Sequence, residues 1–129
     1  MEKKFWIPIV VIVLVAIGWL TFYSIQQHDI RTLNDALIHF LAGDDERGLA
    51  TCARMILYQD PCIFVYMGTH TYRIKKLNAT AEEKTQLLQD YYASLPELCT
   101  TRVHSVHGKQ ICAQEISRVA EALAQTRQG

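Results

Sequence analysis

The most prominent pattern in the chain is an uninterrupted apolar run near its N-terminus. Residues 5–25 contain no charged side chain. A helix of this length reaches roughly 31 Å at about 1.5 Å per residue, which is the thickness of the hydrocarbon core of a bilayer. Aromatic side chains, which favour membrane interfaces, stand near both ends of the run: Phe5, Trp6, Trp19, Phe22 and Tyr23. The pattern predicts one transmembrane helix over residues 5–25.

Beyond residue 25, apolar positions recur at helical spacing in shorter stretches. One stretch predicts a helix that continues from the membrane or restarts at Asp29 and is ended by Gly43. Its apolar positions are Ile30, Leu33, Leu37, Phe40 and Leu41. A second helix is expected from a cap at Asp44 to the Asp60-Pro61 pair. The residues on its apolar face are Leu49, Cys52, Ala53, Ile56 and Leu57.

The C-terminal half predicts two further helices. Thr80 and Glu83 form a capping box at the start of the first, and Pro96 is expected to break it. Its apolar positions are Leu87, Leu88, Tyr91, Tyr92 and Leu95. The last helix has an apolar stripe and a charged face that we expect to point away from the core. The stripe holds Ile111, Cys112, Ile116, Val119, Ala120 and Leu123, and the charged face holds Glu115, Arg118 and Glu121.

Residues 62–77 fit two structures. Their β-type side chains and Gly68 allow a short hairpin. Asp60 in front of them suits a helix N-cap followed by Pro61 at the first helical position, and we favour this helix. The expected fold class is therefore mainly α, with one N-terminal transmembrane helix plus a small disulfide-stapled helical domain.

Charge around the apolar run predicts the topology. Lys3 and Lys4 precede it, whereas few bases follow, so the positive-inside tendency keeps residues 1–4 in the cytoplasm and exports residues 26–129. We expect a single-pass protein of the bacterial inner membrane whose domain is periplasmic. A cleaved signal peptide is the alternative. The run is longer than a usual signal core, and no cleavage site of small residues follows it.

Length and composition narrow the classes of function. The 129 residues leave room for one small domain outside the membrane. Thirteen basic residues balance thirteen acidic ones, which removes the electrostatic basis for binding nucleic acid. No small-molecule substrate is indicated.

Four cysteines in so short a chain predict two disulfides in an oxidising compartment. Local pairing would join Cys52 to Cys62 and Cys99 to Cys112. Nested pairing would join Cys52 to Cys112 and Cys62 to Cys99, and joining Cys52 to Cys99 is the least favoured arrangement. Each bridge would contribute about 2 to 4 kcal/mol, comparable to the whole stability margin of a small core.

The residues that could carry chemistry favour a structural role. Cys99, His104, His107 and Cys112 are residue types that bind zinc, but their spacing is not one of the tight standard patterns. No closely spaced cysteine pair indicates thiol exchange, and no serine has a nucleophile elbow. Phosphate-binding and dinucleotide-binding glycine motifs are also missing from the sequence. We therefore expect no cofactor, no metal and no enzymatic activity.

One stretch mixes aromatic and basic side chains in a way that suits contact with a protein or an anionic headgroup. Its residues are Tyr66, Tyr72, Arg73, Lys75 and Lys76.

The leading hypothesis is a non-enzymatic interaction module held in the lipid bilayer by residues 5–25. It would act on another envelope protein as an accessory, inhibitory or immunity factor. Two alternatives stay open. One is a small subunit of a larger membrane complex or secretion system, and the other is a zinc-binding or redox protein that uses Cys99, His104, His107 and Cys112.

Overall fold

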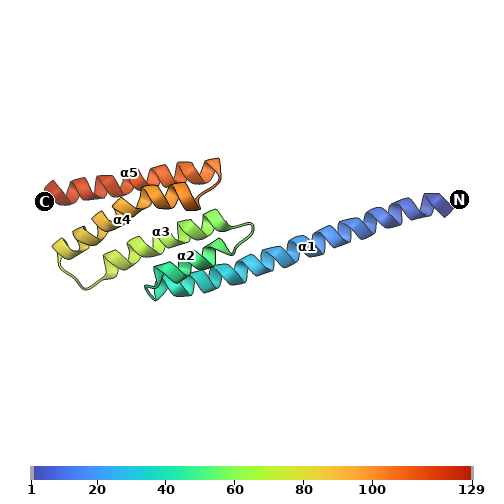
Figure 1. Cartoon of the computed structure of the whole chain (residues 1–129), viewed down its shortest axis with the longest axis horizontal. Coiled ribbons are helices and arrows are strands. Elements are labelled where there is room, and N and C mark those ends of the chain that lie inside the picture. The colour runs from blue at the N-terminus through green and yellow to red at the C-terminus, as the bar shows by residue number, and fades with distance from the viewer. Residues whose placement is uncertain (1, 129) are drawn as a thin grey trace.

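The computed structural model describes residues 2–128, and the side chains of residues 4–126. This range forms five helices and no strand (Figure 1): α1 (Glu2–Leu41), α2 (Asp45–Ala53), α3 (Gln59–Lys76), α4 (Ala81–Arg102) and α5 (Val106–Gln128). The predicted fold class is confirmed: the chain is mainly α, with a long apolar N-terminal helix and a small disulfide-bearing helical part. Met1 of the predicted cytoplasmic tip and Gly129 of the predicted exported domain lie outside the described residues.

α1 is one unbroken helix with two different halves. The first half extends away from the other helices (Figure 1), and its large apolar side chains are exposed from Phe5 to Tyr23. It is long and apolar enough to cross a membrane or to act as a signal sequence. The second half buries a stripe of side chains at helical spacing, Asp29, Thr32, Ala36 and Phe40. The helix thus continues from the apolar segment into the core.

Short turns and caps end α1 and begin α2 as predicted. Gly43 follows the end of α1 with a φ of 87°, a left-handed conformation that glycine adopts without strain. The carboxylate of Asp44 accepts a hydrogen bond from the backbone N–H of Arg47 at 3.4 Å, which caps α2.

α2 ends at Ala53, so the prediction that it continues through Ile56 and Leu57 was wrong. The backbone N–H groups of Ile56, Leu57 and Tyr58 all donate to the carboxylate of Asp29 on α1. A longer helix would use these same groups for its own hydrogen bonds. The long-range contact therefore competes successfully with the local helix, and Ile56 and Leu57 lie exposed in the α2–α3 loop.

Residues 62–76 lie in α3, which confirms the helix that we favoured over the hairpin. The predicted cap was wrong, because α3 begins at Gln59 with Tyr58 at the N-cap. The side chain of Asp60 instead reaches the α4–α5 loop, where it accepts hydrogen bonds from the backbone N–H groups of His104 and Ser105.

α4 begins as predicted, with the Thr80 hydroxyl accepting from the backbone N–H of Glu83 at 3.1 Å. It then runs through Pro96 to Arg102, so the predicted break at this proline was wrong. Leu95 and Leu98 are both buried on either side of Pro96. Their packing favours a continuous helix although the proline removes one hydrogen bond.

Consecutive helices pack side by side, and aromatic rings connect them through the core. The Phe40 ring of α1 lies 5.3 Å from the Tyr66 ring of α3, which lies 6.4 Å from the Tyr91 ring of α4. α2 comes close to α1 at Gly48, where a Cβ atom would overlap the Phe40 ring. A hydrogen atom in place of a side chain is what allows this approach.

Two disulfides each close one interhelical loop. Cys52 bonds Cys62 across the α2–α3 loop with a Cα–Cα distance of 5.6 Å, and Cys99 bonds Cys112 across the α4–α5 loop at 6.0 Å. All four cysteines are bonded, as predicted. Of the pairings left open by the sequence, the structure has the local one.

Candidate functional site

The five residues predicted to bind a partner do not share one surface. Tyr66 is only 7% exposed and belongs to the core, where its ring also lies 5.5 Å from the His70 ring. Tyr72 and Lys76 lie together on the exposed side of α3, with the Lys76 ammonium 5.9 Å from the centre of the Tyr72 ring. This distance is within the range of a cation–π contact.

Tyr72 and Lys76 line a shallow, open hollow of about 340 Å³ beside α3 and α4. We call it the α3–α4 hollow. Its other lining residues are His70, Arg73, Ile74, Leu77 and Leu87. Tyr72, Leu77 and Leu87 expose apolar surface here, next to the cationic group of Lys76. The hollow therefore suits an apolar side chain with negative charge nearby.

Arg73 contributes to the hollow but is already paired. Its guanidinium donates to the carboxylate of Asp45 on α2, and the same carboxylate lies 3.1 Å from Nδ1 of His70. Burial lowers the pKa of His70, although the negative charge of Asp45 opposes this shift. These three groups join α2 to α3 beside the hollow.

Lys75 faces another way. It lines a separate surface depression near Lys84 of α4, and its backbone carbonyl accepts a hydrogen bond from the Lys84 ammonium at 3.1 Å. The predicted surface thus reduces to Tyr72, Lys76 and part of Arg73.

Glu115 does not face away from the core as expected. It accepts a hydrogen bond from the Tyr91 hydroxyl at 3.0 Å and pairs with Arg118 on its own helix. Burial and the neighbouring Glu115 carboxylate raise the pKa of Tyr91. Arg118 also donates to the Thr71 hydroxyl of α3 at 3.3 Å. This network ties α5 to α3 and α4.

Two acids hold the interhelical loops in place, a role that the sequence did not predict for either of them. Asp29 is 0% exposed and accepts three backbone N–H groups of the α2–α3 loop. Asp60 accepts two backbone N–H groups of the α4–α5 loop and the Ser105 hydroxyl. Burial by itself would raise the pKa of each acid, but these hydrogen bonds outweigh it and lower both pKa values.

The sequence contains one signal for Asp29. It occupies the same helical face as Ala36 and Phe40, both of which are fully buried. An acid on an apolar stripe must find partners inside the fold, because an unpaired buried charge is costly. No comparable local signal marks Asp60, which looks like an ordinary helix cap.

Two of the four candidate zinc ligands, Cys99 and Cys112, are bonded to each other in a disulfide, so neither offers a thiolate to a metal. His104 and His107 are exposed. Within residues 2–128, no group of three or more histidine, cysteine, aspartate or glutamate side chains is arranged to hold a metal ion.

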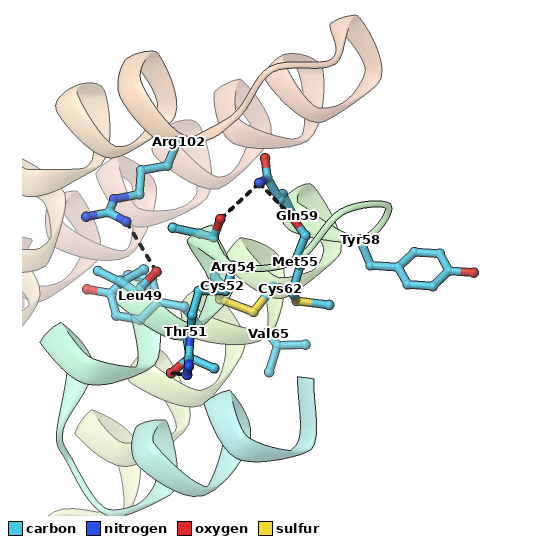
Figure 2. The surroundings of a disulfide bond; sticks show 12 residues. Leu49, Thr51, Cys52, Arg54, Met55, Tyr58, Gln59, Cys62, Val65 and Arg102 are labelled. Atoms are coloured by element: carbon cyan, nitrogen blue, oxygen red, sulfur yellow. Dashed lines mark hydrogen bonds between the residues drawn. A yellow bond between two sulfur atoms is a disulfide. The ribbon is translucent and has the colours of Figure 1, made fainter. Parts of the chain in front are cut away.

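Another hollow, of about 290 Å³, lies next to the Cys52–Cys62 disulfide. Two of its polar side chains, Gln59 and Arg102, already have partners (Figure 2). The Gln59 amide donates to the backbone carbonyls of Ala53 and Met55, and the Arg102 guanidinium donates to the carbonyl of Leu49. These bonds fix α4 and the segment around the disulfide relative to each other, so we assign this hollow a structural role.

Comparisons with protein-family models, curated proteins and solved structures give no match to this chain. The α3–α4 hollow is proposed as the candidate site because it combines exposed apolar groups with an exposed cation in one concave surface.

Proposed function

We propose that the chain is a membrane-anchored, non-enzymatic interaction module of a bacterial envelope. Residues 5–25 cross the inner membrane with the N-terminus in the cytoplasm, and the disulfide-bearing domain works in the periplasm. It binds another envelope protein as an accessory, inhibitory or immunity factor.

The observation that carries this proposal is the continuity of α1. The helix passes without a break from its exposed apolar half to the buried positions Asp29, Ala36 and Phe40. A signal peptidase needs extended chain near the end of the apolar run, whereas here that region is helical and its next turn is bonded into the domain. Continuity thus supports an uncleaved anchor to which the domain is rigidly attached.

Two further features support the orientation. Lys3 and Lys4 precede the apolar segment, as the positive-inside tendency requires for a cytoplasmic N-terminus. Both disulfides belong to the part that follows the segment, and disulfides persist in oxidising compartments.

Binding is favoured over catalysis because three acids inside the fold are already engaged. Asp29 and Asp60 hold loop backbones, and Glu115 is bonded to Tyr91 and Arg118. A general acid or base needs a free lone pair or proton that points at a substrate. What the α3–α4 hollow offers is an apolar surface beside Lys76, which suits a partner segment with an apolar side chain next to an acid.

Co-purification of the full-length protein from membranes solubilised in mild detergent tests the proposal. Wild type should recover a stoichiometric partner, and the double variant Tyr72→Ala/Lys76→Glu should lose it. Tyr92→Ala/Lys109→Glu is the matched control, because it makes the same chemical changes at exposed residues outside the hollow. Recovery of the protein alone under several detergents, or equal partner recovery with both double variants, would count against the proposed surface.

Replacing residues 5–25 with an unrelated transmembrane sequence separates an anchor from a subunit whose span packs on other helices. The proposal predicts that partner recovery survives the exchange. Its loss would favour the subunit of a larger membrane complex.

A further inference from the structure

The α2–α3 loop presents two apolar side chains to the outside. Ile56 is 61% exposed and Leu57 is 44% exposed. The loop backbone is firmly held, because the N–H groups of both residues donate to Asp29, and Cys52–Cys62 closes the segment. Their exposure is therefore a property of a fixed loop, and both side chains are available for contact with an apolar surface.

The distance of this loop from the apolar segment, measured along the α1 axis, follows from the α1 residues to which the loop is bonded. Asp29 comes four residues after the end of the apolar segment at residue 25, which is about 6 Å along a helix axis. The Gln26 amide also donates to the Tyr58 hydroxyl at 3.4 Å, one turn closer to that segment. The headgroup layer on each side of a bilayer is about 5 to 7 Å thick. A loop bonded to residues 26 and 29 is thus at the level of the lipid headgroups.

Other residues at this end fit the same environment. In Figure 1 the α2–α3 and α4–α5 loops both lie at the end of the domain from which the first half of α1 projects. Figure 2 shows the Tyr58 ring pointing away from the disulfide, where an aromatic ring with a hydroxyl suits a membrane interface. Arg31 follows Asp29 by two residues and Arg54 precedes Ile56 by two, and both are exposed. They can pair with anionic headgroups, although the Arg54 guanidinium also donates to the Thr51 hydroxyl at 3.3 Å.

We propose that the domain rests on the outer surface of the bilayer through this loop, with Ile56 and Leu57 inserted at the interface and Arg31 and Arg54 facing lipid phosphates. This inference rests on the membrane anchor in the proposed function. It fixes which side of the domain is covered by lipid, and it leaves the α3–α4 hollow open to a partner.

Quenching of tryptophan fluorescence by lipids brominated near the carbonyl end of the acyl chain tests this proposal. The full chain is placed in vesicles of phosphatidylethanolamine and phosphatidylglycerol. Its two tryptophans, Trp6 and Trp19, are replaced by phenylalanine, and one new tryptophan is introduced by Ile56→Trp or Leu57→Trp. Leu77→Trp is the matched control, because Leu77 is 47% exposed at the opposite end of α3.

The expected result is quenching at positions 56 and 57 that is at least about twofold stronger than at position 77, together with a blue-shifted emission, as for an indole at the interface. Equal, weak quenching at all three positions would overturn the inference. The parent chain with only Trp6→Phe distinguishes failure of the loop contact from failure of the membrane anchor. Quenched Trp19 with unquenched positions 56 and 57 refutes the loop contact alone, whereas unquenched Trp19 refutes the anchor and the loop contact together.

Discussion

The two interhelical loops that are closed by disulfides are held in the same way, but the acids that hold them are buried to different degrees. In each, a disulfide joins the flanking helices, and an acid from an earlier part of the chain accepts the backbone N–H groups of the loop. For the α2–α3 loop the acid is Asp29, fully buried and bonded to three N–H groups. For the α4–α5 loop it is Asp60, half-buried and bonded to two N–H groups and one hydroxyl.

The difference separates two contributions that usually occur together. A disulfide stabilises mainly by restricting the unfolded chain, so its contribution depends on the length of the closed loop. A buried carboxylate stabilises the folded state, so its contribution depends on how many donors it satisfies and how little water can replace it. The two disulfides are similar, whereas the two acids differ in burial and in the number of N–H groups that they accept. Substitutions at each position should therefore change the free energy of unfolding by different amounts.

Asp29→Ala should have the largest effect. It leaves three loop N–H groups without their fully buried acceptor, which costs about 3 to 5 kcal/mol. Urea denaturation of the full chain in detergent micelles, followed by circular dichroism, measures this loss. Asp35→Ala is the control, because Asp35 is an exposed acid on the same helix. Equal stability of the two variants would show that Asp29 does not hold the loop.

Removal of either disulfide should lower the free energy of unfolding slightly less than Asp29→Ala does, and by nearly the same amount for both disulfides. Cys52→Ala/Cys62→Ala opens a separation of 10 residues, and Cys99→Ala/Cys112→Ala opens one of 13. Loop entropy gives about 3 kcal/mol for each. The same denaturation assay compares them. Since Cys52 and Cys62 are both fully buried while Cys99 is half-buried, the first pair should cost slightly more. A much larger cost for the second pair would contradict the comparison.

Asp60→Ala should have a smaller effect than Asp29→Ala. Water can reach the α4–α5 loop and replace part of the lost acceptor, so the expected cost is about 1 to 2 kcal/mol. Hydrogen exchange of the His104 and Ser105 amides should rise, while exchange at Ile56 and Leu57 stays unchanged. Asp90→Ala provides an exposed acid as control. Faster exchange in both loops would mean that the α2–α3 and α4–α5 loops are coupled rather than independent.

The smallest expected effect is on the pH dependence of the free energy of unfolding. The folded pKa of each acid is below its ordinary value, so the stabilisation is fully present above pH 4 and is lost as the pH falls through the folded pKa. Wild type should therefore lose more stability than Asp29→Asn between pH 5 and about pH 3. Denaturation midpoints at the two pH values test this. Parallel losses in both proteins would mean that other carboxylates dominate acid unfolding.

Local features of the fold were predictable from the sequence. Gly43, Asp44 and Thr80 act through their own backbone or residues three positions away, so short sequence patterns identify them. The long apolar segment and the helical spacing of buried positions such as Cys112 and Val119 are equally local.

Features that depend on distant parts of the chain were missed. α2 ends early because of Asp29, and Asp60 leaves its expected cap for a loop more than forty residues later. Glu115 turns inward because Tyr91 lies opposite. None of these contacts follows from spacing within one helix. The same reason explains the candidate site. Tyr66 lies in the core, and Lys75 is exposed but lines a different depression, so Tyr72 and Lys76 are left together at the α3–α4 hollow.

The proposed function requires one unbroken chain that joins a membrane anchor to a domain with two oxidised cysteine pairs. The intact mass of the protein extracted from membranes, after free thiols have been blocked with an alkylating reagent, tests it most directly. The expected mass is that of the full-length chain, 14.8 kDa, with no alkyl group added. A mass lacking the first 20 to 25 residues would contradict the anchor, and added alkyl groups would contradict the disulfides and the exported location.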